Sequence, residues 1–387
     1  MAPSVRVTAL APSVMYERTE LIRRAEAAKD VCELFRAASR RLRRLVPFDA
    51  AVWLAADPAT SLPTAPTRGE NVAHFGGQER CARLWEIEFT VEDVNRYQEL
   101  ARAPRPAAGL RLVTDDRPAR SSRYRELLRP SGFGDELRAA MRVDGSPWAL
   151  VTLFRAEGRP AFDAHETELV AGLSSPLAEA IREHARPAAQ SAPAHDHGPG
   201  LLLFDAGGEL ISMNDDAHAW LEELSGDLAG RSAFGVRLPL VVVSTLMHAH
   251  AIAGEPGRRT ARVRMRSGAS GRWLVCHASC LRDADGRIGA TSLVIEPAKS
   301  AEIAPIITEA YELSPRERQI TMLIARGCAT AEMAARLGLS AHTVRDYVKA
   351  VFEKVGVSSR GELVAKLFAE HYAPVHFAAG GHEAVED

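Results

Sequence analysis

The sequence lacks any apolar run long enough to cross a bilayer. Its longest runs, such as LPLVVV at Leu238–Val243, are far shorter than the roughly 18 residues that a membrane-spanning helix needs. The opening segment, MAPSVRVTALAPSVMYERTE, has no extended apolar core, so we expect no signal peptide. These absences predict a cytoplasmic protein without a membrane partner.

Cysteine is scarce, with five among 387 residues, an odd number without close pairing. This pattern favours reduced thiols over a disulfide framework. Cys276 and Cys280 share one side of a predicted strand, but extended chain separates them by roughly 13 Å. That distance is too long for one zinc ion, so we predict no metal site and no cofactor.

The sequence also lacks the motifs that mark common catalytic centres. It contains no GxxxxGK[ST] phosphate loop, no HExxH zinc pair and no GxSxG turn. The acidic pairs Asp115-Asp116 and Glu86-Ile87-Glu88 have no neighbouring base or metal pattern. We therefore expect that the protein is not an enzyme. The net charge of −2 gives no global attraction to nucleic acid, although a long chain can contain a small basic module.

Two breaks divide the chain. Glu183–Gly200 is rich in Pro, Ala and Gly without apolar periodicity, which indicates a linker. A weaker break lies at Glu296–Ile306. The predicted parts are a first domain (18–184), a linker (185–198), a middle domain (199–297), a last domain (306–372) and a flexible tail (373–387).

The last domain carries four helix signals and is predicted to be all-α. Ser314-Pro315-Arg316-Glu317 is a capping box with Pro at the first helical position, and that helix ends at Gly327. A second helix ends at Gly338, a third runs from the N-cap Ser340 to Gly356, and a fourth covers residues 359–372. The predicted inward positions are Ile320, Leu323, Ile324, Met333, Ala334, Leu337, Val344, Val348, Val351 and Val355.

Only Gly338-Leu339-Ser340 separates the second of these helices from the third. A helix, a short turn with Gly and a longer helix form the layout of a helix-turn-helix. In that layout the later helix enters the DNA major groove and reads bases with its N-terminal residues. The valine stripe would hold this helix to its neighbours, and its polar side would face DNA. A polar face that only contacts water is the alternative interpretation.

The segment from Leu313 to Arg360 resembles the DNA-binding domain of LuxR-type transcription regulators. The matching residues are Leu313, Arg316, Glu317, Leu323, Gly327, Glu332, Ala334, Leu337, Ser340, Thr343, Val344, Lys354, Val357 and Arg360. The resemblance implies base reading by Arg345, Asp346 and Lys349. It implies backbone contacts or helix positioning by Thr330, Ser340, His342, Thr343 and Arg360. It also implies a homodimer through Leu363, Val364, Leu367 and Phe368.

The segment departs from the family pattern in three places. Ala329 replaces a capping Ser or Thr, a loss of about 1 kcal/mol; Ala331 replaces a common Lys, and Tyr347 replaces a common His. Asp346 could accept a hydrogen bond from cytosine N4 or pair with Lys349 one turn later. Residues 311–372 hold nine Lys or Arg and seven Asp or Glu, a net charge of +2, so the domain is only mildly basic.

The middle domain resembles a PAS domain. A buried strand at Leu201–Phe204, a turn, a second strand and the helix cap Asn214 precede three alternating strands. The resemblance predicts an α+β sensor with an antiparallel sheet. His248 and His250 could suggest haem, but a spacing of two does not place them on one helical face.

The first domain resembles a GAF domain, a second α+β sensor with an antiparallel sheet flanked by helices. One helix is predicted over residues 20–46, followed by a strand, a hairpin at Asp144-Gly145-Ser146 and a closing helix. Trp53, Trp85 and Trp148 could line a ligand cavity or belong to the core.

The sequence therefore predicts a sequence-specific transcription regulator that binds double-stranded DNA as a homodimer. RNA polymerase and an unidentified small-molecule effector are further candidate partners. The alternative is a regulator that acts by protein contacts and whose DNA-binding head is weak or vestigial. The substitutions at Ala329 and Ala331 and the low positive charge favour that alternative.

Overall fold

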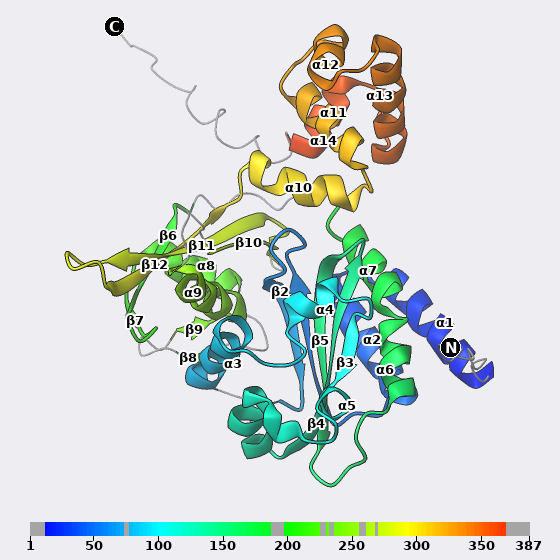
Figure 1. The fold of residues 1–387 in the computed structure, drawn as a ribbon. Coiled ribbons are helices and arrows are strands. Elements are labelled where there is room, and N and C mark those ends of the chain that lie inside the picture. Colours follow the sequence, from blue (N-terminus) through cyan, green and yellow to red (C-terminus); the bar gives the residue numbers. More distant parts are fainter. Residues whose placement is uncertain are drawn as a thin grey trace, which may run out of the picture.

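The computed structural model of the chain describes residues 12–72, 77–186, 197–224, 230–231, 236–254, 261–267 and 270–368. Figure 1 shows the two five-stranded antiparallel sheets with their helices, and a further group of helices at one end. The predicted tail (373–387) and most of the predicted linker (185–198) lie outside the described residues. Within those residues, no helix has both the length and the apolar character that crossing a membrane requires.

The first module is an antiparallel sheet covered by helices on both faces. Its strands are β1 (Ala50–Ala56), β2 (Pro63–Glu70), β3 (Ala107–Gly109), β4 (Phe133–Val143) and β5 (Ser146–Ala156), in the order β2-β1-β5-β4-β3. Its α-helices are α1 (Pro12–Glu26), α2 (Val31–Leu45), α3 (Gln78–Thr90), α4 (Tyr97–Arg102), α5 (Leu110–Val113), α6 (Ala164–Ala171) and α7 (Ser174–Glu183). Short turns of helix lie at Pro118–Arg120, Tyr124–Leu128 and Arg129–Ser131. The predicted hairpin joins β4 to β5, with Asp144 and Gly145 both at positive φ.

The prediction of one continuous helix over residues 20–46 was wrong, because α1 and α2 are separate helices. The Asp30 carboxylate accepts a hydrogen bond from the Glu33 backbone N–H at 2.7 Å and so caps α2. A side-chain oxygen that satisfies a free first-turn donor favours a new helix start at this point. The apolar spacing continues across the break, which is why periodicity alone did not reveal it.

The middle module is a second five-stranded antiparallel sheet. Its elements are β6 (Gly200–Asp205), β7 (Leu210–Met213), α8 (Asp215–Glu223), α9 (Leu240–Ile252), β10 (Ala261–Arg266), β11 (Trp273–Arg282) and β12 (Ile288–Pro297). The strand order is β10-β11-β12-β6-β7, and β8 (Gly230–Arg231) pairs with β9 (Arg237–Leu238) apart from it. Counted along the chain, both five-stranded sheets have the same order: second, first, fifth, fourth, third. As predicted, Asn214 caps α8 by accepting a hydrogen bond from the Ala217 N–H.

Helix α9 joins the two modules. It is apolar on nearly all sides, because it packs between its own sheet and α3 and β2 of the first module. The His248 ring of α9 lies edge-on to the Phe89 ring of α3, with 5.1 Å between centroids. A shared apolar cluster includes Trp85 of the first module and Trp220 of the second. The two sheets are therefore parts of one packed body.

The helical head follows β12. It consists of α10 (Ser300–Ala310), α11 (Pro315–Ala325), α12 (Thr330–Leu337), α13 (Ala341–Val355) and α14 (Arg360–Phe368). Figure 1 shows α10 between the sheets and the other helices of the head. Ile303, Ile306 and Ile307 of α10 are buried in a cluster that extends from the first module into the head. This shared core connects the head to both modules.

Candidate DNA-binding site

The turn between α12 and α13 is set by a glycine in a left-handed conformation. Gly338 has φ +64°, and its N–H donates to the Ala334 carbonyl, which ends α12. The Leu339 N–H donates to the same carbonyl at 3.0 Å. Non-glycine residues rarely adopt this φ. The turn therefore lets α13 leave at an angle to α12, which is the geometry of a helix-turn-helix.

The inner side of α13 is held by apolar and ionic contacts. Val344, Val351 and Val355 are buried, as predicted, and α13 packs on α11 and α12. Near its end, Lys354 Nζ donates to Glu317 Oε2 at 2.7 Å and to the Glu312 carbonyl at 3.0 Å. Burial would raise the pKa of Glu317, but hydrogen bonds from Lys354 and Ser314 outweigh it and lower this pKa. These contacts fix the rotation of α13 about its axis.

The outer side of α13 presents charged groups to solvent. Figure 1 shows the helix along the outside of the head. Arg345, Asp346 and Lys349 are all exposed. Asp346 lies 3.6 Å from His342 Nδ1, and Lys349 lies 3.8 Å from Glu353. The expected alternative in which Asp346 pairs with Lys349 is therefore not the arrangement seen. No described residue forms an ion pair with Arg345.

The residues predicted to contact the DNA backbone or position helices gather at the starts of α12, α13 and α14. The Ser340 hydroxyl accepts a hydrogen bond from the Thr343 N–H at 3.0 Å, and the two hydroxyls are 2.8 Å apart. Arg360 donates to Thr330 Oγ1 at 2.8 Å and to the Cys328 carbonyl at 3.1 Å. Arg360 thus ties the start of α14 to the start of α12. Helix N-termini with hydroxyl groups are suited to phosphate contacts.

The residues predicted for dimerisation have mixed environments. Leu363 and Leu367 are buried against α10 and α11 of the same chain. Val364 is half-buried, while the side chain of Phe368 lies outside the described part of the chain. Two of the four predicted side chains therefore belong to the core of the head.

The inner face of the first sheet contains a buried ionic network that sequence reasoning missed. Arg138 forms an ion pair with Glu88 at 2.9 Å, and Arg123 forms one with Glu136 at 2.9 Å. All four residues are at most 5% exposed. The Arg138 guanidinium also lies 3.6 Å from the ring centre of Tyr97. The i, i+2 spacing of Glu136 and Arg138 on β4 was the available signal, because it places both on one face of a strand.

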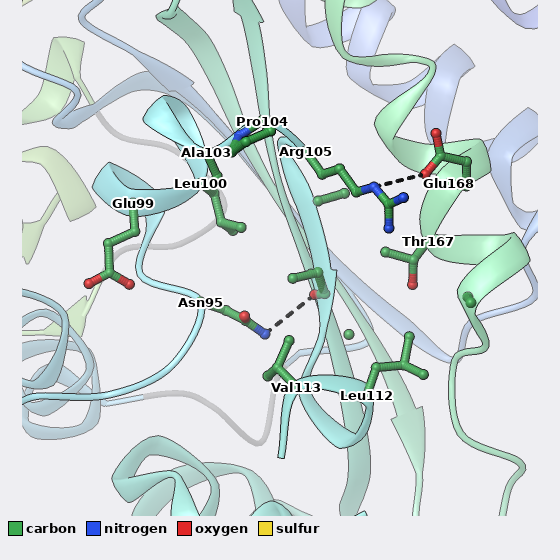
Figure 2. A pocket seen from close by; sticks show the side chains of 14 residues that line it. Asn95, Glu99, Leu100, Ala103, Pro104, Arg105, Leu112, Val113, Thr167 and Glu168 are labelled. Atoms are coloured by element: carbon green, nitrogen blue, oxygen red, sulfur yellow. Dashed lines mark hydrogen bonds and ion pairs between the residues drawn. The ribbon is translucent and has the colours of Figure 1, made fainter. Parts of the chain in front are cut away.

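The first module also has an open groove beside the edge strand β3. Its volume is about 540 Å³, and its walls come from β3, α4, α5 and α6. Figure 2 shows Leu112 and Val113 at one end and the Arg105–Glu168 ion pair at the other. The lining is mainly apolar, and the Asn95 side-chain N–H donates a hydrogen bond to the Ala108 carbonyl.

Trp53 and Trp85, two of the tryptophans considered as cavity-lining residues, do not line this groove; both are buried in the core. Among the described residues there is no group of three His, Cys, Asp or Glu side chains suited to a metal ion.

Comparisons with known protein families agree with this geometry. Residues 311–367 match the family of bacterial regulatory proteins, luxR family, and residues 30–181 match the GAF domain. The chain therefore carries a LuxR-type helix-turn-helix domain and a GAF domain. Both resemblances drawn from the two ends of the sequence are confirmed.

Curated transcription regulators are similar to a short stretch of this chain. The transcriptional regulatory protein UhpA of Escherichia coli (strain K12) is 45% identical over 56 residues, which are 14% of this chain and 29% of UhpA. DesR of Bacillus subtilis (strain 168), also a transcriptional regulatory protein, is 34% identical over 61 residues, 16% of this chain and 31% of DesR. The chain thus spans less than a third of the length of these relatives.

Among solved structures, the LuxR-type receptor VqmA of Vibrio cholerae is similar to 44% of this chain and 81% of its own, at 18% identity and a TM-score of 0.20.

Proposed function

We propose that the protein is a sequence-specific, DNA-binding transcription regulator. The observation that carries this proposal is the polar face at the start of α13, where Arg345 and Lys349 are both exposed, on a helix whose apolar face is fixed in the head. Asp346 would accept a hydrogen bond from cytosine N4. Alternatively, its pair with His342 would orient the imidazole ring of His342. Thr330, Ser340, Thr343 and Arg360 would position the head on the DNA backbone.

The two sheet modules would sense a signal or bind other proteins. We propose that the middle module, residues 199–297, is a PAS-like domain, supported by its strand order and the two helices α8 and α9. A small-molecule effector would act by binding with different affinity to two conformations of the protein that differ in the position of the head. We further propose a cytoplasmic homodimer that contacts RNA polymerase at its operator and catalyses no reaction.

The proposal is tested by selecting bound fragments from genomic DNA with the purified protein at roughly physiological salt. A recurrent, roughly palindromic motif is expected from a dimer. In binding assays on that motif, Arg345→Ala and Lys349→Ala should each weaken binding by about 1–3 kcal/mol.

The matched control is Arg326→Ala. Arg326 is also an exposed arginine of the head, but it lies at the end of α11 and is not part of α13. The substitution Arg326→Ala removes one positive charge, as the α13 variants do, but it should leave the preference for the DNA motif unchanged. If both α13 variants kept wild-type affinity for the motif, the assigned DNA face would be wrong.

A protein-interaction regulator is the second candidate. Ala329 provides no side-chain cap for α12, and the head is only mildly basic, both of which favour a weak DNA-binding head. This candidate predicts a stable protein partner and no enriched DNA motif, even for an isolated head covering residues 300–372. An enriched motif with the isolated head alone would instead indicate that the modules restrain DNA binding.

A further inference from the structure

A small cavity lies where the first module, the middle module and α10 meet. Its volume is about 70 Å³, and its walls include Trp148 of β5, Trp273 of β11 and Ile306 of α10. A water molecule occupies about 30 Å³ of liquid, so the cavity has room for a carboxylate group but not for a large metabolite. It is separate from the groove beside β3, with which it shares no lining residue.

Three polar atoms of the cavity walls are buried without a hydrogen-bond partner among the described residues. They are Thr64 Oγ1, Trp148 Nε1 and Arg264 Nε. Thr64 is 4% exposed and Trp148 is 3% exposed. Two of these atoms can only donate a hydrogen bond, and the hydroxyl can also donate. Because buried donors without acceptors are destabilising, this set favours a ligand that supplies acceptor oxygens.

The charges around the cavity do not balance. Arg264 donates to the buried Asp57 carboxylate at 3.1 Å, so these two groups neutralise each other. Arg266 donates to the His184 carbonyl at 2.7 Å and to the Gly271 carbonyl at 2.9 Å. Within the described part of the chain, no carboxylate pairs with it. Burial lowers the pKa of Arg266, the effect expected of a guanidinium that lacks a counter-anion.

We propose that this cavity binds the carboxylate of a small organic monoanion. One unmatched positive charge suits a monoanion better than a dianion, and the tryptophan and isoleucine walls suit a short apolar group beside the carboxylate. The hydroxyl of Thr64 and the indole N–H of Trp148 would donate hydrogen bonds to its oxygens. The site takes side chains from two modules and from α10, so a bound anion would hold these three parts together. That regulatory role rests on the proposed function, whereas binding itself does not.

The test is a titration of the full chain with sodium acetate, replacing sodium chloride at constant ionic strength. Trp148 and Trp273 line the cavity, so their fluorescence should report occupancy. A saturable change in emission is expected, together with a higher midpoint of thermal unfolding at saturating acetate.

Two variants address the site and one serves as the control. Arg266→Gln removes the unmatched charge and should weaken acetate binding at least tenfold. Thr64→Val keeps the side-chain shape, so it tests the site even if Arg266→Gln misfolds, and it should weaken binding several-fold. Arg262→Gln is the control, because Arg262 lies on the same face of β10 but pairs with Glu302 at 3.0 Å, outside the cavity. It should bind acetate like the wild type.

Three outcomes would overturn the proposal. These are no saturable response to acetate in the wild type, an unchanged response in both Arg266→Gln and Thr64→Val, and an equal response to inorganic phosphate at the same ionic strength. No DNA is present in this titration. Acetate binding without a selected DNA motif would therefore refute the proposed function and support the anion site. A selected DNA motif without acetate binding would support the proposed function and refute the anion site.

Discussion

At the scale of single residues, the start of α12 has an unused capping position. Ala329 is the N-cap residue, is exposed and has an extended backbone, but it has no oxygen to accept a first-turn N–H. Ala329→Ser should raise the free energy of unfolding of the head by about 1 kcal/mol. Denaturant unfolding of the wild type and the variant measures this difference.

The matched substitution is Ala335→Ser, at an exposed position within the same helix. Serine is less favourable than alanine in a helix interior, so this variant should be slightly less stable than the wild type. Equal effects at positions 329 and 335 would contradict the capping argument.

The Glu317–Lys354 pair should make the stability of the head depend on pH. The pKa of Glu317 in the folded chain lies below its ordinary value of 4.5, so the folded state favours the carboxylate. Its contribution is complete above the unfolded pKa and is lost as pH falls through the lower, folded pKa. The midpoint of thermal unfolding should therefore fall below about pH 4.5, and Glu317→Gln should flatten that part of the curve.

Glu317→Gln should also be less stable at pH 7, by about 1.5–3 kcal/mol, because it removes a buried, charge-assisted hydrogen bond. Glu332→Gln is the control: Glu332 pairs with Arg336 at 2.8 Å, but both side chains are about half exposed. An exposed pair contributes little, so this variant should keep both the wild-type stability and its pH curve. The same loss of stability in both variants would show that burial is not the cause.

At the scale of elements, two glycines of the head should respond to alanine in opposite directions. Gly338 ends α12 at φ +64° with no neighbouring atom in the way of a Cβ, so Gly338→Ala costs only backbone strain, about 1–2 kcal/mol. Gly361 is the second residue of α14, and its φ is not positive. Alanine fits that backbone and restricts the unfolded chain, so Gly361→Ala should stabilise the head by about 0.4–1 kcal/mol.

Thermal unfolding of both variants provides the measurement. Opposite shifts in the unfolding midpoint are expected, and Gly338→Ala should also weaken binding to a selected DNA motif, because it disturbs the angle of α13. A stable Gly338→Ala variant with unchanged DNA affinity would mean that the turn tolerates another conformation.

At the scale of the whole molecule, the first module holds the junction between α10 and the rest of the head. Arg182 of α7 forms an ion pair with Glu312, which itself has a positive φ of 55°. Arg186 Nε donates to the Ala310 carbonyl at 3.0 Å, and its guanidinium lies 5.3 Å from the ring centre of Tyr311. These contacts give the first module a direct means of orienting the head.

Arg182→Ala should therefore loosen this junction. Because Glu312 is 57% exposed, we expect a coupling of only about 0.5–1 kcal/mol between Arg182→Ala and Glu312→Ala in a double-mutant cycle. Limited proteolysis should cut Arg182→Ala faster within residues 310–314 than the wild type. Arg336→Ala, which breaks an ion pair inside α12, should not change this cleavage. Equal cleavage of all three proteins would show that the contact does not restrain the junction.

Much of the head could be predicted from the sequence, because its signals act over a few residues. The capping box of Ser314 and Glu317, the left-handed Gly338 and the buried valines of α13 all lie where apolar spacing and turn chemistry placed them. The break between α1 and α2 was missed, because a polar cap inside a continuous apolar pattern is a weak signal.

The amino-acid sequence by itself determined the helix-turn-helix and its exposed face, since these follow from local caps, glycines and periodicity. The antiparallel sheets were predicted from the resemblance of the first two parts of the sequence to GAF and PAS domains. Only the tertiary structure decided that the two sheets form one body, that Asp57 meets Arg264 207 residues later, and that Arg182 meets Glu312 130 residues later. Such pairings depend on how separate modules pack, and each charge alone looks like an ordinary surface residue. For the same reason, the cavity between the modules has no signature in the sequence.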